Sequence, residues 1–204
     1  MSYKKESVNM KAVKTCIKHD DSTGLETMID RDPTILNDVF YEKRVVKTLF
    51  SYTIECNAIH CFEFFLVKQV DVNAESGIAI GTALKMIFHP KGHQNDFFLE
   101  TLMSISVTKI HLGLNYMKRA KVMNDNVILL QRLLDHPGLD TTSVEAQETF
   151  MNYINESIFA KNMDDIVNLF VQKNITFFKD KILRGMCQYA VYWATNSCFI
   201  FTEK

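Results

Sequence analysis

Residues 57–74 read NAIHCFEFFLVKQVDVNA and contain the most informative pattern in the chain. Phe62, Phe65 and Leu66 are spaced i, i+3 and i+4, so they share one face of a helix. Polar residues, among them Asp71 and Asn73, follow this apolar group. The stretch therefore predicts an amphipathic helix that ends in a short polar turn.

The same apolar spacing recurs along the chain at nearly even intervals. It begins at residues 25, 62, 99, 130 and 167, so successive starts are 37, 37, 31 and 37 residues apart. Self-similarity at a fixed period indicates a repeat architecture. The five groups are Leu25/Met28/Ile29, Phe62/Phe65/Leu66, Leu99/Leu102/Met103, Leu130/Leu133/Leu134 and Val167/Phe170/Val171.

A second apolar-periodic segment precedes each of these helices, so the repeating unit is a helical hairpin. One hairpin cannot bury its apolar face alone, but stacked hairpins share a continuous core. The sequence therefore predicts an all-α solenoid of about five stacked helical hairpins. The first helices are expected at Ala12/Val13/Cys16/Ile17, Leu49/Tyr52/Thr53/Cys56, Ala83/Leu84/Ile87/Phe88, Tyr116/Ala120/Met123 and Phe150/Ile154/Ile158.

The ends of the chain differ from the repeats. Residues 1–9 are expected to form an N-terminal extension, residues 10–180 the array, and residues 181–204 a C-terminal capping helix and tail. The apolar run Phe199-Ile-Phe201 has two interpretations. It packs against the last repeat, or it forms a contact with a partner or with a second copy of the chain, because an exposed apolar patch usually marks an interaction site.

Residues 57–74 resemble an ankyrin repeat, in which an Asn or Gly turn precedes a V-x-x-L-L helix and an x-x-G-A-D-V-N segment. The offsets agree, since Asn57 precedes Phe62 by five residues and Leu66 precedes Asn73 by seven. Weaker echoes cover roughly residues 10–180. The Phe-, Asn- and Lys-rich style is similar to divergent ankyrin proteins of protists and large DNA viruses.

The chain also departs from the ankyrin pattern. It has no complete Thr-Pro-Leu-His tetrapeptide, and Thr82-Ala-Leu84 stands where Thr-Pro-Leu would open a first helix. Gln69 and Asn174 replace the glycine that follows the second helix, and residues 89–96 form a longer inter-helix stretch than usual. The resemblance is therefore to a degenerate array.

The resemblance implies a non-catalytic module that presents a rigid concave surface, built from finger tips and first helices, to a protein partner. A related hypothesis is that the protein is an inhibitory mimic that occupies a host or signalling component. The fingers map to residues 37–41, 73–78 and 142–145, and less securely to His89–His93. The expected partner-binding residues are Asn37, Tyr41, Asn73, Glu75, Ser76, Ile78, Thr142 and Glu145.

A catalytic or metal-binding domain is the alternative from another class of protein. Cys56, His60 and Cys61 form one group of metal-capable side chains, and His89 and His93 form another. Pro90 and Gly92 would interrupt a helix that placed the two histidines on one face, so a solvated loop is expected there. No phosphate-binding or nucleophile-elbow motif is present, and the chain is expected to be neither an enzyme nor a cofactor protein.

Charge and cysteine content bear on partners and location. The chain has 23 Lys+Arg against 24 Asp+Glu, which argues against nucleic acid or an anionic membrane as a partner. No apolar run approaches the ~20 residues that span a bilayer, and no secretory signal is found at the N-terminus. Five irregularly spaced cysteines suit reduced thiols, so a cytoplasmic location is expected, with nuclear entry left open.

Overall fold

The computed structural model describes residues 8–42, 45–88, 91–115, 126–157 and 163–173. Several expectations fall outside these ranges: the fourth first helix around Ala120 and Met123, His89, and the capping helix and tail at 181–204. The chain divides into two compact units, Met1–Tyr116 and Met117–Lys204, which are treated separately below. Among the described residues, no helix has the length and apolar character needed to cross a bilayer.

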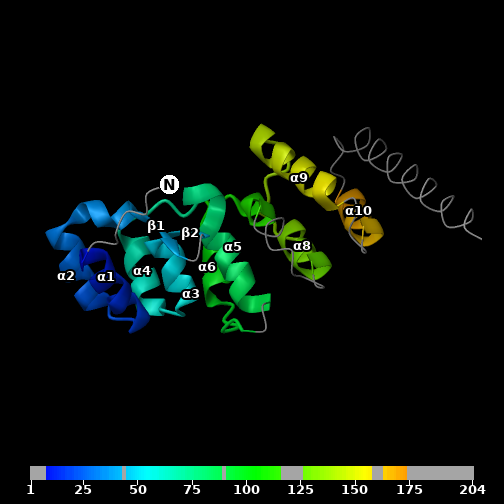
Figure 1. Ribbon diagram of the computed structural model, residues 1–204. Helices are drawn as coiled ribbons and strands as arrows, with labels where there is room; N and C mark the ends of the chain where they lie inside the picture. The colour runs from blue at the N-terminus through cyan, green and yellow to red at the C-terminus, as the bar shows by residue number, and fades with distance from the viewer. Residues whose placement is uncertain (1–7, 43–44, 89–90, 116–125, 158–162, 174–204) are drawn as a thin grey trace, which may run out of the picture. The chain divides into compact units, whose positions relative to one another are not determined.

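The first unit is built from three consecutive helical hairpins (Figure 1). The first helices of neighbouring hairpins contact each other, since α3 contacts both α1 and α5. The second helices α2 and α4 also contact each other. This order of first and second helices is the one that the apolar spacing predicts. The hairpins are α1 (Val8–Lys18) with α2 (Ser22–Arg31), α3 (Leu49–Glu55) with α4 (Ile59–Val67), and α5 (Ala74–Phe88) with α6 (Phe97–Ser104).

A small antiparallel sheet lies between the first two hairpins. After α2 come a 3-10 turn, η1 (Pro33–Asn37), and the strands β1 (Val39–Glu42) and β2 (Val45–Thr48). The protein is mostly helical, as predicted, and this two-stranded sheet is an addition that the all-α prediction did not include. Each strand has only four residues, which is too short for a period-two pattern to stand out, but both are rich in the β-branched and aromatic residues that favour strands.

Residues in the left-handed region mark the turns between first and second helices. Asp20, Asn57 and Gln94 all have positive φ, at 53°, 57° and 54°, and they are spaced 37 residues apart. After α1 and α3 the following N–H group donates to the carbonyl five residues earlier, which closes the helix in a Schellman-type cap. Asp21 then caps α2 by accepting a hydrogen bond from the Gly24 N–H group.

Aromatic side chains join neighbouring hairpins in the core of the first unit. The Phe62 ring of α4 stacks on Phe50 of α3 at 4.8 Å between centroids. It also meets Phe98 of α6 edge-on at 5.0 Å. All three residues are buried. Phe62 belongs to the apolar group that the repeat pattern singles out, so that pattern identifies a core position correctly.

The start of the third hairpin differs from the expectation. Glu75, Ser76 and Gly77 are all in the left-handed region before α5 continues as a regular helix. A Cβ atom at Gly77 would lie 2.5 Å from the Cβ atom of Leu112 in η2 (Ile110–Leu112), so only glycine fits there. Thr82 lies inside α5 instead of opening a first helix. Thr48 takes that role at α3, where it forms a reciprocal capping box with Ser51.

The second unit contains three described helices, which are α8 (Asn126–Leu134), α9 (Val144–Ser157) and α10 (Met163–Gln172). α10 contacts both α8 and α9. The predicted core residues Leu130, Leu133, Leu134, Phe150 and Phe170 are all buried. The helix order therefore agrees with the prediction, in which α8 is the second helix of the fourth hairpin and α9 and α10 are the two helices of the fifth.

Candidate functional site

The β1–β2 hairpin, called the finger below, carries three exposed apolar side chains. Tyr41 is 70% exposed, Val45 52% and Val39 41%. Phe40, between two of them, is buried and packs edge-on against Tyr52 of α3 at 5.6 Å. Phe40 thus anchors one face of the finger on α3, while Val39 and Tyr41 on the opposite face are exposed.

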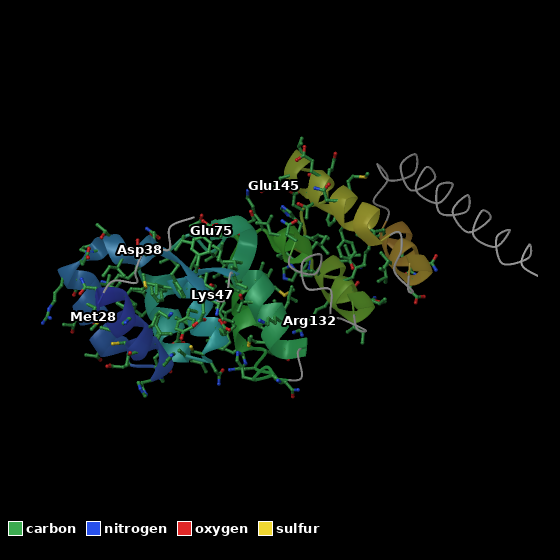
Figure 2. All side chains as sticks on the ribbon, viewed as in Figure 1. Met28, Asp38, Lys47, Glu75, Arg132 and Glu145 are labelled. Atoms are coloured by element: carbon green, nitrogen blue, oxygen red, sulfur yellow. The ribbon has the colours of Figure 1, made fainter. Side chains whose placement is uncertain are left out.

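A charged cluster fixes the finger to α3. The Lys47 ammonium group donates hydrogen bonds to Glu42 of β1 and Glu55 of α3. Its side chain is only 13% exposed. Burial on its own would lower the pKa of Lys47. The hydrogen bonds that Lys47 donates to both carboxylates, together with their negative charge, outweigh burial and raise the pKa above its usual value. Lys47 therefore stays charged and holds the finger in place (Figure 2).

A second lysine connects the finger to the first hairpin. The Lys14 ammonium nitrogen lies 4.5 Å from the centre of the Phe40 ring and 3.8 Å from the Glu42 carboxylate. A cation over an aromatic face is attracted by the negative charge density of the ring. First helices of two hairpins thus contact the same finger, α1 through Lys14 and α3 through Glu55, which accepts a hydrogen bond from Lys47 of β2.

The segment before α5 is tied to the loop that follows α6. The Asn73 side-chain amide donates to the Val107 carbonyl at 2.8 Å, and its oxygen accepts from the Lys109 N–H group at 2.8 Å. Both ends of the Asn73 amide are therefore engaged inside the protein. Asn73 therefore has a structural role, and its contact with a partner stays a prediction.

The other expected partner-binding residues lie in different settings. Asn37, Glu75 and Ser76 are exposed, and Ile78 is half-buried at the start of the regular part of α5. Figure 2 shows Asp38, next to Asn37, and Glu75 along the same margin of the first unit. Thr142 and Glu145 are exposed in the second unit, before and in the first turn of α9.

The metal-capable group Cys56, His60 and Cys61 does not converge. The His60 ring nitrogen Nδ1 lies 2.7 Å from Asp20 Oδ2, and the Cys61 N–H group donates to Asp20 Oδ1 at 2.9 Å. Burial raises the pKa of the Cys61 thiol to about 12 and also raises that of Cys56, whose thiol instead neighbours Tyr52. No group of three His, Cys, Asp or Glu side chains within the described ranges could hold a metal ion.

His93 lies in the loop between α5 and α6, as expected, but it is half-buried and hydrogen-bonded instead of solvated. Its ring nitrogen Nε2 lies 2.8 Å from the Ile54 carbonyl, and Nδ1 accepts from the Asn95 N–H group at 3.0 Å. Because the carbonyl can only accept, these bonds assign the proton to Nε2. The loop is indeed longer than the turns after α1 and α3, and its extra length lets His93 reach back to the preceding hairpin.

Sequence reasoning missed the residues that fix the finger. Lys14, Lys47 and Glu55 look like ordinary surface charges in the sequence, because nothing in their local spacing shows that three elements bring them together. The β-branched and aromatic residues of Val39-Phe40-Tyr41 and Val45-Val46-Lys47-Thr48 were the available signal of a hairpin.

Comparison with protein-family models, with curated proteins and with solved structures yields no match to this chain. The function must therefore be argued from the geometry and chemistry of the chain itself.

Proposed function

We propose that this protein is a non-catalytic, ankyrin-like repeat module that binds another protein through the finger and the adjoining first helices. The observation that carries the proposal is the exposure of Val39 and Tyr41 on one face of a finger whose opposite face is anchored by Phe40 and Lys47, with Val45 also exposed at the start of β2. Apolar side chains exposed together on a fixed element usually mark an interaction site.

The links between neighbouring hairpins support the repeat part of the proposal. Asp20 and His60 are 40 residues apart, Ile54 and His93 are 39 apart, and Asn57 bonds Asn95 across 38 residues. Each pair joins one inter-helix turn to the next. Side chains placed about one repeat apart thus make equivalent connections along the first unit, which is what a stack of similar hairpins requires.

The second unit contains a link of similar span. Lys173, just after α10, pairs with Asp135, just after α8, and this pair also joins positions 38 residues apart along the chain. α8 and α10 are both second helices in the predicted register. The same spacing thus supports stacking within this unit as well.

A binding role also fits the chemistry of the side chains that could have served in catalysis. Asp20 accepts hydrogen bonds from the His60 and Cys61 N–H groups, and His93 bonds the neighbouring hairpin. Their hydrogen-bonding capacity is used to join hairpins. A rigid surface loses little conformational entropy on association, so such a module can bind a partner without a deep pocket. We also propose that the protein binds this partner in the cytoplasm.

The test is affinity capture from cell extract with the full chain and with variants of the finger. Tyr41→Ala and Val45→Ser are expected to abolish specific capture without changing the circular dichroism spectrum. Val67→Ser is the matched control, because Val67 is 78% exposed but lies on α4, away from the finger. Equal capture by all three variants would contradict a binding site on the finger.

A further inference from the structure

We propose that the outer edge of β1 binds an extended segment of the partner protein as an added β-strand. This inference rests on the proposed binding function and specifies the conformation and chemistry of the partner. It is carried by the register of the finger, by the exposure of its side chains and by its charge.

The register determines which backbone groups of β1 are free to bind. Glu42 pairs with Val45 across a connection of two residues, and Tyr41 and Val39 pair with Val46 and Thr48. Residues that close a two-residue connection exchange backbone hydrogen bonds, and such pairs alternate with non-hydrogen-bonded pairs along an antiparallel ladder. The N–H and C=O groups of Val39 and Tyr41 therefore point away from β2.

No other strand pairs with that edge among the residues that the structure describes, where the sheet consists of β1 and β2 alone. Natural edge strands are usually protected by proline, by a bulge or by a charged residue. Residues Val39 to Tyr41 contain none of these protecting residues. The edge thus offers two donors and two acceptors to an extended chain, which is the geometry of strand addition.

The side chains of β1 specify what the added strand would carry. Val39 and Tyr41 are on the same face of the finger and are exposed, whereas Phe40 points to the opposite face and is buried. Side chains of neighbouring strands meet on the face that they share. The partner segment is therefore expected to carry apolar residues at alternate positions, next to Val39 and Tyr41.

Charge complementarity specifies one end of the segment. Asp38 is in an extended conformation, with φ −64° and ψ 139°, so it continues the line of β1. Its side chain is exposed and forms no ion pair within the described part of the chain. Of the cations in residues 37–48, Lys43 and Arg44 follow the C-terminal end of β1, whereas Asp38 precedes its N-terminal end, and Lys47 is already neutralised by Glu42 and Glu55. A lysine or arginine of the partner segment is therefore expected beside Asp38.

The first experiment selects binders from a phage-displayed library of random dodecapeptides on the immobilised full chain. Enriched peptides are expected to combine a basic residue with apolar residues at alternate positions. Each is then synthesised with backbone N-methyl groups at one or the other alternate set of positions, and affinity is measured by fluorescence anisotropy. Methylation of the set that faces β1 should weaken binding at least tenfold, and methylation of the other set less than twofold.

The second experiment locates the peptide on the protein by amide hydrogen exchange. Binding should slow exchange at Val39 and Tyr41 at least tenfold and change exchange at Phe40 little, since the Phe40 amide already lies in the ladder with β2. Val39→Pro should weaken binding at least tenfold more than Val39→Ala, which removes only side-chain contact, and Asp38→Asn should weaken binding severalfold. The exchange measurement remains decisive if the proline variant does not fold.

Three results would overturn strand addition: no enriched peptide, equal effects of the two methylation patterns, or protection outside β1. None of them would remove the proposed function if protein capture still depended on Tyr41. Conversely, loss of that dependence together with no enriched peptide would count against both. The two proposals are therefore separable by experiment.

Discussion

Lys47 shows how one side chain can hold an element in place. It connects β2 to Glu42 of β1 and Glu55 of α3. Lys47→Met should lower the free energy of unfolding by about 1–3 kcal/mol, because the two carboxylates lose a charged hydrogen-bond donor. Chemical denaturation measures the loss. Lys18→Met is the control, since Lys18 is exposed at the end of α1, and it should change stability by less than about 0.5 kcal/mol.

The pH dependence of the Lys47 contribution has a definite sign. The folded protein raises the pKa of Lys47 above 10.5, because hydrogen bonds to Glu42 and Glu55 outweigh burial. The stabilisation is then fully present below pH 10.5 and is lost as the pH rises through the folded-state pKa. The stability difference between wild type and Lys47→Met should be constant from pH 7 to about 10 and shrink above that. A difference that grew with alkaline pH would contradict this account.

The Cys61 thiol should be inert in the folded protein. Burial raises its pKa to about 12, with a smaller contribution from Asp20, so the nucleophilic thiolate is scarce at neutral pH. Labelling with iodoacetamide at pH 8 should modify Cys61 at least a hundredfold more slowly in the folded protein than in urea, as measured by peptide mass spectrometry. Rapid labelling of Cys61 in the native state would reopen the catalytic alternative.

At the scale of elements, the turn that closes helix α4 contains a position that would suit glycine better than the residue present. Gln69 is exposed with φ 56°, and Val70 donates to the Phe65 carbonyl in a Schellman-type cap. Glycine adopts this conformation without the steric cost that a side chain imposes. Gln69→Gly should therefore raise the melting temperature, corresponding to a gain of up to about 1 kcal/mol.

A substitution in the same helix provides the matched control. Glu63 is exposed in the interior of α4, where glycine costs about 1 kcal/mol because it gains backbone freedom in the unfolded chain. Glu63→Gly should thus lower the melting temperature while Gln69→Gly raises it. Changes of the same sign at both positions would show that the left-handed turn at Gln69 is not formed in solution.

At the scale of the whole molecule, a stack of hairpins transmits destabilisation to its neighbours. Leu49 is fully buried in α3, which contacts α1 and α5. Leu49→Ala should cost about 2–5 kcal/mol, and hydrogen exchange should show the largest loss of protection in α1, α3 and α5. In a repeat array stability depends mainly on nearest neighbours, so α9 and α10 should be affected less.

The reciprocal variant lies in the second unit. Leu133 is fully buried in α8, which contacts α10. Leu133→Ala should have a cost in the same range, with the largest loss of protection in α8 and α10. If both variants reduced protection uniformly along the chain, the protein would behave as one cooperative domain, and the proposed repeat architecture would be wrong.

Much of the helical framework could be predicted from local spacing. Phe62, Phe65, Leu99 and Leu133 were placed in the core because residues spaced i, i+3 and i+4 share a helix face, and all four are buried. The longer turn before α6 was also expected. Helix formation and amphipathicity depend on residues close together in the chain, so this information is present in the sequence itself.

The candidate site could be predicted only in part. Tyr41 was placed on a finger by the ankyrin-like register, and it is exposed on β1. Asn73 was predicted to contact a partner, and the structure adds that its amide binds backbone groups that lie 34 and 36 residues further along. Such a bond depends on how the third hairpin folds back, which the spacing around Asn73 cannot show.

The sequence by itself thus determined the order of helices, the core face of each and the near-37-residue interval between them, because these follow from local periodicity. Only the tertiary structure decided that Lys14, Lys47, Glu42 and Glu55 gather at the finger, that His60 and His93 join hairpins, and that one edge of β1 pairs with no further strand in the described part of the chain. Each of these depends on groups from separate elements, whose approach is set by packing and not by their spacing in the chain.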